Sequence, residues 1–190
     1  MKSVPSYSNQ RVGIFVDVHN LYHSAKNLYH GRVNYSELIK YLVGDRQLIR
    51  SMAYVVKSEG IIEQPVRPTA GTRRGAPVLS TEAAFFEALE NAGLELRVKD
   101  LQVYAGGMKK ADWDVGMAVD AIRMSSFLDV IILVTGDGDH LPLVDYLKWG
   151  VGRLVEVAAF KRSASAKLQD AADKFINIEE IPKIIIKRGY

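Results

Sequence analysis

The sequence predicts an α/β fold in which a mainly parallel sheet is covered on both faces by helices. The first observation is a run of five apolar, mostly β-branched residues over 130–134, which is typical of a strand buried on both faces. The second is a similar run over 11–18. The third is the alternation of such strands with segments of helical spacing along the chain, which favours parallel pairing.

Composition and charge limit the class of protein. The chain has 190 residues, of which 48% are hydrophobic and 25% charged, enough for one domain with a full core. No apolar run approaches the roughly 20 residues that span a bilayer, and residues 1–10 form a polar, flexible leader that lacks the apolar stretch of a signal peptide. The absence of cysteine excludes disulfides and thiolate chemistry and suits the cytoplasm. A net charge of +3 permits an anionic partner.

The first half of the chain supplies strands and helices around one long loop. After the strand at 11–18 we expect a helix to Leu28, and a second helix that Asn34 or Tyr35 opens and Gly44 ends. A strand over 49–57 follows. Residues 58–80 are rich in proline, glycine and arginine and predict a long basic surface loop. Then come a helix over 81–91 and an alternating strand over 94–104.

The second half continues the alternation. A basic turn at 106–110 precedes a strong helix over 112–127. Beyond the strand at 130–134 we expect, in order, a helix over 141–149, a strand over 153–157, a helix over 163–172, a strand over 175–178 and a terminal helix over 179–187. Ser163 or Ser165 suits the cap of the helix that follows them. The apolar run 181–186 either packs on its own sheet or serves a homodimer, and we see no domain boundary after residue 10.

Aspartates follow the two most apolar strands. Asp17 ends the first, and Asp137 and Asp139 follow the second after a Thr-Gly turn. If these strands are neighbours, their carboxylates converge at the edge where open parallel sheets bind ligands. Asp139 also suits the N-cap of the next helix, since Leu141 and Pro142 can begin one. That structural role explains Asp139 well and Asp137 poorly.

The helix at 112–127 carries three more aspartates. Asp112 suits its N-cap, so Asp114 is the better candidate for a site. Asp120 lies in an apolar stretch, where a carboxylate needs a partner or a polar pocket. One helix face presents Asp114 and Asp120 only roughly together, so we do not expect them to be equivalent ligands. Oxygen ligands without cysteine suit Mg²⁺ or Mn²⁺. Such ions activate water and stabilise the leaving oxygen of a phosphodiester.

Four stretches occur in one order along residues 11–178. They are Phe-Val-Asp-Val-His-Asn (15–20), Lys-Ala-Asp-Trp-Asp-Val-Gly-Met-Ala-Val-Asp (110–120), Val-Thr-Gly-Asp-Gly-Asp-His (134–140) and Ala-Ala-Asp-Lys-Phe-Ile (171–176). Together they resemble the NYN domain, in the LabA-like (DUF88) branch of the PIN-like nuclease superfamily. The resemblance implies a three-layer Rossmann-like (PIN-like) fold, an acidic pocket and metal-dependent cleavage of RNA. It implies catalytic roles for Asp17, Asn20, Asp114, Asp137 and Asp139, the four aspartates being metal ligands, and Asp120 matches a further acidic position.

The chain departs from the family pattern at three of these positions. Asp112 replaces a glycine, Thr135 a serine and His140 a phenylalanine. The first two changes are mild. His140 either adds a ligand or proton donor, or is a partly exposed histidine at a helix start, which is the interpretation we favour. The loop 58–80 is longer than the family minimum.

Basic residues in predicted loops are candidates for contact with a phosphate backbone. They are Arg73, Arg74, Lys109, Lys110, Lys161 and Arg162. The alternative for each is a solvated surface. Trp113 beside Asp114 is a candidate for stacking on a base, although packing in the core is more common for such a residue.

The leading hypothesis is therefore a ribonuclease that uses Mg²⁺ or Mn²⁺ in an acidic pocket. The alternative is a non-catalytic RNA-binding or regulatory module on the same fold. A phosphatase or nucleotide hydrolase is a weaker third hypothesis. The chain has no Gly-x-x-x-x-Gly-Lys-Ser/Thr loop, and the stretch after Asp17 lacks the Asp-x-Asp form of an aspartyl-phosphate enzyme.

Overall fold

The computed structural model describes residues 7–57, 81–100, 102–103, 109–110 and 112–187. Its central sheet has the strand order β4-β3-β1-β7-β8-β9, and every neighbouring pair is parallel. These strands are β1 (Arg11–Asp17), β3 (Gln47–Lys57), β4 (Glu95–Asp100), β7 (Val130–Val134), β8 (Leu154–Ala159) and β9 (Lys174–Asn177). The predicted parallel sheet is confirmed, and the two apolar strands β1 and β7 are neighbours.

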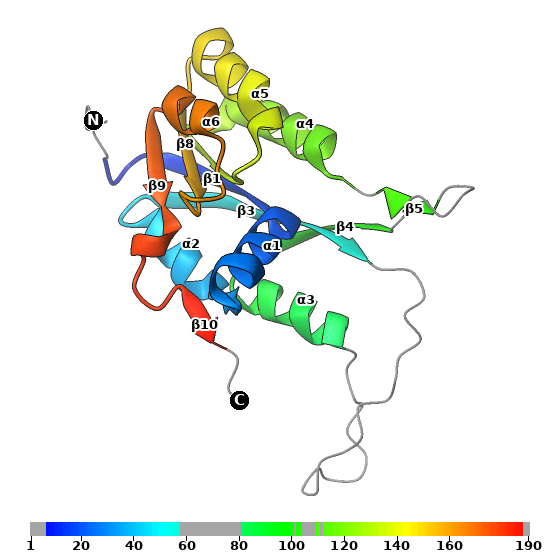
Figure 1. Ribbon diagram of the computed structural model, residues 1–190. Coiled ribbons are helices and arrows are strands. Elements are labelled where there is room, and N and C mark those ends of the chain that lie inside the picture. Colours follow the sequence, from blue (N-terminus) through cyan, green and yellow to red (C-terminus); the bar gives the residue numbers. More distant parts are fainter. Residues whose placement is uncertain (1–6, 58–80, 101, 104–108, 111, 188–190) are drawn as a thin grey trace, which may run out of the picture.

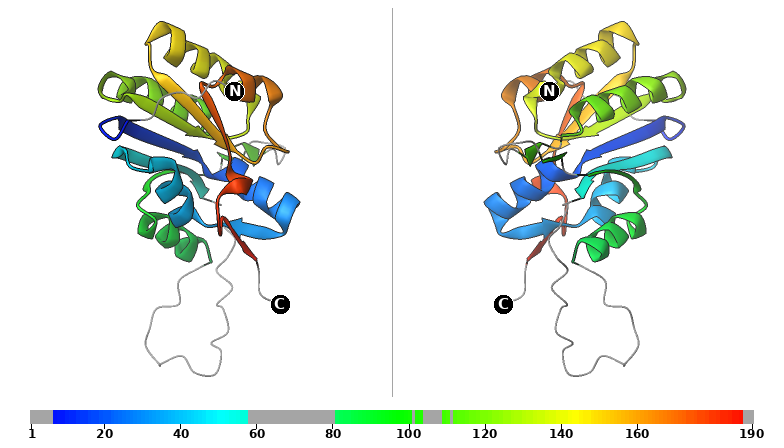
Figure 2. Two further views of the ribbon diagram at one scale, coloured as in Figure 1. Left: turned by 90° about the vertical axis from the view of Figure 1, so that its left-hand side faces the viewer. Right: turned by 90° about the vertical axis from the view of Figure 1, so that its right-hand side faces the viewer.

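Helices cover both faces of this sheet, as predicted (Figure 1). One layer holds α1 (Val18–Tyr29), α2 (Tyr35–Val43) and α3 (Thr81–Asn91). The other holds α4 (Asp114–Met124), α5 (Leu141–Asp145) and α6 (Ala166–Ala171). The side views in Figure 2 show the sheet running between the two layers. The architecture is a three-layer α/β fold.

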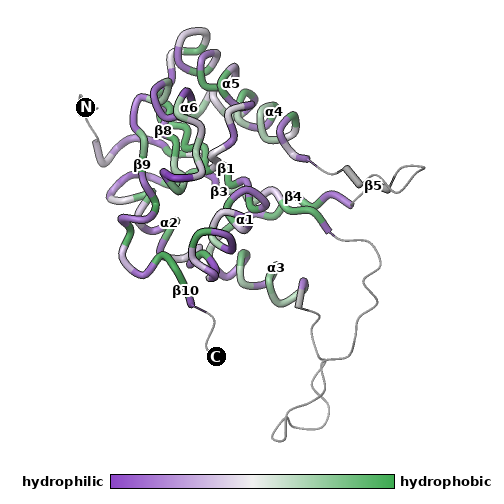
Figure 3. The backbone as a smooth tube through the Cα atoms, viewed as in Figure 1, coloured by the Kyte–Doolittle hydropathy of each residue, from purple (hydrophilic) through white to green (hydrophobic). Residues whose placement is uncertain are grey.

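Alternation along the strands divides the core in two. Val12, Ile14 and Val16 of β1 face the layer of α1, α2 and α3, whereas Phe15 between them faces α4 and α5. All four side chains are fully buried, because successive residues of a strand point to opposite faces and here both faces are covered. Figure 3 shows the hydrophobic segments gathered in the sheet between the helices.

Most predicted boundaries in the first half agree with the structure. The side chain of Asn34 accepts a hydrogen bond from the backbone N–H of Glu37 and caps α2, which ends at Gly44. Gly44 has a φ of 56°, a conformation that favours glycine. The strand expected over 94–104 is divided into β4 and the short β5 (Gln102–Val103), which pairs with β6 (Lys109–Lys110). The loop prediction for 58–80 lies outside the described residues.

The prediction of a terminal helix over 179–187 is wrong. A single 3₁₀ turn, η4 (Ile178–Glu180), is followed by β10 (Ile185–Lys187), which pairs antiparallel with β2 (Gly31–Val33). Pro182 and the β-branched isoleucines after it disfavour a helix. Ile181 and Ile184 are buried in the core, so much of the apolar run packs inside the protein.

Two predicted helix starts are also corrected, and one predicted helix is divided. Helix α4 begins at Asp114 rather than Asp112, and Trp113 occupies the cap position without a side-chain hydrogen bond. Helix α6 begins at Ala166, and Ser165 at its cap makes no side-chain cap bond. The helix expected over 141–149 consists of α5 and a π-helical turn, η3 (Tyr146–Gly150). It is preceded by a 3₁₀ turn, η2 (Gly138–His140).

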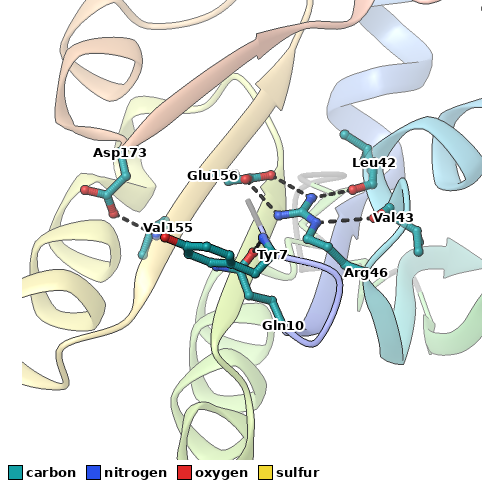
Figure 4. A network of polar contacts seen from close by, with 8 residues as sticks. All are labelled: Tyr7, Gln10, Leu42, Val43, Arg46, Val155, Glu156 and Asp173. Atoms are coloured by element: carbon teal, nitrogen blue, oxygen red, sulfur yellow. Dashed lines mark hydrogen bonds and ion pairs between the residues drawn. The ribbon is translucent and has the colours of Figure 1, made fainter. Parts of the chain in front are cut away.

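A buried ion pair ties the start of β3 to β8. Nη1 and Nη2 of Arg46 donate to the two carboxylate oxygens of Glu156 at 2.9 and 3.1 Å. The same guanidinium also donates to the carbonyl oxygens of Leu42 (2.6 Å) and Val43 (3.2 Å) at the end of α2. Figure 4 shows Arg46 between Glu156 and these carbonyl groups.

Candidate functional site

The ends of β1 and β7 lie side by side and bring two predicted site segments together. Val16 is opposite Val134 in the parallel register, so Asp17 and Thr135 come next on the two strands. The hydroxyl of Thr135 donates to Oδ2 of Asp17 at 3.2 Å and accepts from the backbone N–H of Asp137 at 3.2 Å. The register of two buried strands therefore sets the positions of Asp17 and of the loop that carries Asp137.

Asn20 connects the same two segments from the first turn of α1. Its side-chain oxygen accepts a hydrogen bond from the backbone N–H of Gly136 at 3.0 Å. Its own backbone N–H donates to Oδ1 of Asp17 at 3.0 Å, so Asp17 is the N-cap of α1. A carboxylate offers about four acceptor positions, and two protein donors leave the others of Asp17 available. Asn20 therefore holds the segments that carry Asp17 and Asp137 in place.

The loop after β7 is held close to the segment before α6. A Cβ on Gly136 would lie 3.0 Å from Cα of Ala164, and one on Gly138 would lie 3.0 Å from Oγ of Ser165. Only glycine allows this approach without displacement of the neighbouring segment. The backbone N–H of Ser165 donates to the carbonyl of Gly136 at 2.9 Å. Gly136 and Gly138 thus fix the positions of Asp137, which lies between them, and of Asp139, which follows them.

The capping role predicted for Asp139 belongs to Asp137. Oδ1 of Asp137 accepts from the backbone N–H of Asp139 at 3.0 Å and caps η2. Helix α5 starts after His140 and has no side-chain cap bond. The extra 3₁₀ turn moves the cap two residues toward the strand, which leaves the side chain of Asp139 exposed.

Acidic side chains from three elements meet in two groups that share Asp114. In one group, single ligand atoms of Asp17, Asp114 and His140 all lie within 4.8 Å of one another. In the other, single oxygens of Asp114, Asp137 and Asp139 do so. Asp114 is the first residue of α4, so the start of this helix faces the carboxyl ends of β1 and β7. All four predicted aspartates are therefore brought together.

The electrostatics of this edge disfavour negative charge. The pKa of Asp114 is raised, first by burial and then by the carboxylates of Asp17, Asp112 and Asp137, while His140 opposes the rise. Within the described ranges, no lysine or arginine lies within 4.0 Å of the four clustered aspartates. Carboxylates this close require protons or cations for compensation.

His140 is the site residue whose placement the sequence prediction missed. Its side chain is 2% exposed, so the expectation of a partly exposed histidine is wrong. Its Nε2 lies 3.6 Å from Oδ1 of Asp114 and has no hydrogen-bond partner. The signal was available in the family resemblance, because a phenylalanine at this position indicates a buried site.

Comparison with known proteins agrees with this geometry. The family model of the NYN domain matches residues 11–179. The chain belongs to the NYN domain family. NYN domains form a PIN-like nuclease family whose nucleases typically use divalent metals. The donor set of this NYN protein fits such an ion, since it combines carboxylate oxygens with a buried imidazole nitrogen that lacks a partner.

A solved structure has the same fold. A protein of unknown function from Vibrio parahaemolyticus superimposes with a TM-score of 0.78 at 26% sequence identity, covering 96% of this chain and 100% of the other. The search of curated proteins found no match. In the described part of the NYN protein, no helix combines the length and hydropathy required to cross a membrane.

Asp120 lies outside both groups. It is buried, accepts a hydrogen bond from the hydroxyl of Tyr54 at 3.1 Å and forms an ion pair with Arg97 at 3.3 Å. Burial, followed by the charge and hydrogen bonding of Asp120, raises the pKa of Tyr54. Asp120 is thus compensated within the protein, as its apolar surroundings require.

Trp113 is held by protein contacts rather than free to stack. Its Nε1 donates to the carbonyl of Val55 at 2.8 Å, and its ring lies 5.4 Å from that of Tyr54. Nζ of Lys99 lies 5.7 Å from the centre of the indole. These contacts anchor the residue immediately before Asp114 and so help to place that carboxylate.

The predicted basic contacts are only partly described. Arg73 and Arg74 lie outside the described residues, and of Lys109 and Lys110 the structure describes the backbone of β6. Lys161 and Arg162 are exposed in the turn after β8. This turn leads into Ala164 and Ser165, which contact the glycines of the Asp137 loop. These two cations therefore lie on a segment that adjoins the acidic groups.

Proposed function

We propose that this NYN protein is a metal-dependent ribonuclease that hydrolyses phosphodiester bonds of RNA, in the LabA-like (DUF88) branch of the family. The observation that carries the proposal is the pair of ligand groups that share Asp114 at the carboxyl edge of β1 and β7. Ligand sites of open parallel sheets lie at this edge. We assign the activity to the cytoplasm, which suits a chain without cysteine.

In this proposal Asp17, Asp114, Asp137 and Asp139 hold Mg²⁺ or Mn²⁺. Carboxylate oxygens are the ligands that both ions prefer. A divalent cation at this position activates water and neutralises charge on the reacting phosphate. Asn20 and Thr135 keep the carboxylates in place through the hydrogen bonds described above. Their rigidity matters because catalysis depends on the position of the reacting groups.

RNA reaches the site along basic residues. Lys161 and Arg162 are exposed on the turn that adjoins the Asp137 loop, and we add Arg73, Arg74, Lys109 and Lys110 from the sequence. Their positive charge offsets the phosphates outside the acidic pocket. The charge of the whole chain, +3, has the sign that an RNA ligand requires.

The test is incubation of the purified full chain with a mixture of RNAs in Mg²⁺, in Mn²⁺ and in EDTA. We expect cleavage with either metal and none in EDTA. Asp17→Asn and Asp137→Asn should each abolish cleavage and leave the circular dichroism spectrum unchanged. Asp145→Asn changes an exposed aspartate of α5 outside both groups and serves as the matched control.

Two outcomes would count against the assignment. Undiminished cleavage by the Asp17→Asn/Asp137→Asn double variant would remove the acidic groups from the reaction. Tight binding of RNA without cleavage in either metal would favour the non-catalytic RNA-binding module instead. Release of phosphate from small phosphomonoesters would indicate a phosphatase.

A further inference from the structure

His140 is the one nitrogen donor in the two ligand groups, and its surroundings leave that nitrogen without a role in the fold. The side chain is 2% exposed, and Nε2 has no hydrogen-bond partner. A buried polar atom without a partner destabilises the folded protein. Neutral imidazole is the commonest nitrogen ligand for metals in proteins. The same atom lies 3.6 Å from Oδ1 of Asp114, and the imidazole belongs to the ligand group that Asp17 and Asp114 form with it.

The position of His140 is held by its neighbours on both sides. The residue ends η2 and directly precedes α5, and its backbone N–H donates to the carbonyl of Asp137 at 3.3 Å. Leu143 and Val144 of α5 are buried in the core that faces α4. The side chain is therefore placed toward the acidic groups by the packing of α5 and is not a mobile surface histidine.

The two ligand groups differ in chemistry. Asp114, Asp137 and Asp139 offer oxygen alone, which suits Mg²⁺. Asp17, Asp114 and His140 offer two carboxylates and one imidazole. First-row transition metals accept nitrogen ligands more readily than Mg²⁺, which prefers oxygen and water. A cation site with this mixed donor set should discriminate between the two kinds of ion.

We infer that His140 is a direct ligand of a divalent transition metal, together with Asp17 and Asp114, and that this group selects Mn²⁺ over Mg²⁺. The inference rests on the metal site of the proposed function and specifies which ion occupies one part of it. The family pattern has a phenylalanine at this position, so the preference belongs to chains that carry histidine here.

The experiment measures binding of Mn²⁺ to the full-length, metal-free protein by electron paramagnetic resonance. Pulsed measurements report coupling between the ion and a coordinated ¹⁴N nucleus. We expect this coupling in the wild type and its loss in His140→Phe, which keeps a buried ring. His23→Phe replaces an exposed histidine of α1 outside both groups and should keep the coupling.

Competition with Mg²⁺ supplies the second readout. Loss of a residue that hydrogen-bonds to a metal ligand lowers the affinity for the metal by roughly 10–100-fold. Loss of the ligand itself should therefore lower the Mn²⁺/Mg²⁺ preference by at least about tenfold. Binding of Mg²⁺ at the oxygen group should persist in His140→Phe. The wild type could show nitrogen coupling while His140→Phe keeps the same Mn²⁺/Mg²⁺ preference. That result would overturn the inference that His140 selects Mn²⁺ over Mg²⁺.

The possible failures can be told apart. If the wild type binds Mn²⁺ without nitrogen coupling, the inference about His140 is overturned while the metal site of the proposed function stands. If the wild type binds Mg²⁺ but no Mn²⁺, the inference about His140 is overturned and the proposed metal site stands; if it binds neither ion, both fail. Should His140→Phe not fold, the spectra of the wild type and His23→Phe still decide, since no other histidine belongs to a ligand group in the described residues.

Discussion

Two acidic regions of this protein face opposite electrostatic circumstances. Glu156 of β8 is met by the guanidinium of Arg46, with both side chains less than 10% exposed, and the remaining donors of Arg46 are used by backbone carbonyls (Figure 4). Asp114 at the carboxyl edge of the sheet is 41% exposed, and among the described residues only His140 lies within 4.0 Å of it as a basic partner. One carboxylate is neutralised by the fold, and the other is not.

The comparison extends to the other acidic residues that contact the sheet. Asp120 is paired with Arg97, Asp129 with Arg11 and Asp173 with Lys148. The clustered aspartates lack any such lysine or arginine among the described residues. Charge that the protein leaves uncompensated is compensated by protons or by a bound cation. The difference separates carboxylates that the fold pairs with a cation from those that the proposed function assigns to a metal ion.

The largest effect on stability is expected when the buried ion pair of Glu156 and Arg46 is broken. Glu156→Gln leaves a buried guanidinium without its counterion, and removal of one partner from a buried ion pair costs about 3–5 kcal/mol. We expect the free energy of unfolding, measured with urea, to fall by this amount. Glu95→Gln is the matched control, because its partner Arg50 and Glu95 itself are both half exposed; the expected loss is below about 1 kcal/mol. Equal losses in the two variants would contradict the comparison.

The next largest effect is a rise in stability when a cation binds to the two ligand groups that share Asp114. Binding to the folded state alone raises the free energy of unfolding by about 2.7 kcal/mol when the ligand is present at about 100 times its Kd. We expect a corresponding rise in Tm with Mn²⁺, reversed by EDTA. Asp114→Asn should lose it, because Asp114 belongs to both ligand groups. A rise of the same size in Asp114→Asn would place the ion elsewhere.

A smaller and opposite effect is expected without metal. The pKa of Asp114 is raised in the folded state, so its ionisation at neutral pH opposes folding. In EDTA at pH 7, Asp114→Asn should therefore be more stable than the wild type, and the gain should vanish as pH falls and the wild-type carboxyl is protonated. Because water screens a side chain that is 41% exposed, the gain is below about 1 kcal/mol. Urea unfolding at two pH values measures it, and lower stability of the variant at pH 7 would refute the prediction.

The smallest effect on stability is expected for the half-buried ion pair of Asp129 and Arg11. Hydrogen bonds from the side chain and backbone of Arg11 lower the pKa of Asp129 to about 2. A lowered pKa contributes stability above the ordinary value near 4 and loses it as pH falls through the folded-state value. Asp129→Asn should accordingly show a shallower loss of stability between about pH 4 and pH 2. An identical acid profile for variant and wild type would show that the pair makes no contribution.

Local patterns predicted the elements that build the site. The buried strands at 130–134 and 11–17 were recognised from their apolar composition, and Asn34 and Gly44 marked the ends of α2. The aspartates stood out because they directly follow buried strands, although the structure gives the capping role to Asp137 and not to Asp139. These signals are local, since a run of side chains reports its own burial and its own turn.

Other features depended on contacts between distant segments. The last strand was predicted as a helix because its partner, β2, lies about 150 residues earlier in the chain, and pairing across that distance leaves no local pattern. The capping role passed from Asp139 to Asp137 because a 3₁₀ turn, packed against the segment before α6, precedes α5. The burial of His140 likewise follows from how α5 packs on the sheet.

By itself, the sequence determined which residues could carry the chemistry: acidic side chains after buried strands, in an order that resembles one family. The tertiary structure alone decided which of them meet, because only the pairing of β1 with β7 and the position of α4 bring ligand atoms within 4.8 Å of one another. It also decided which carboxylates are neutralised, as Asp120 is by Arg97, and which have no lysine or arginine partner among the described residues. Strand and helix propensities are local, whereas electrostatic compensation depends on neighbours in space.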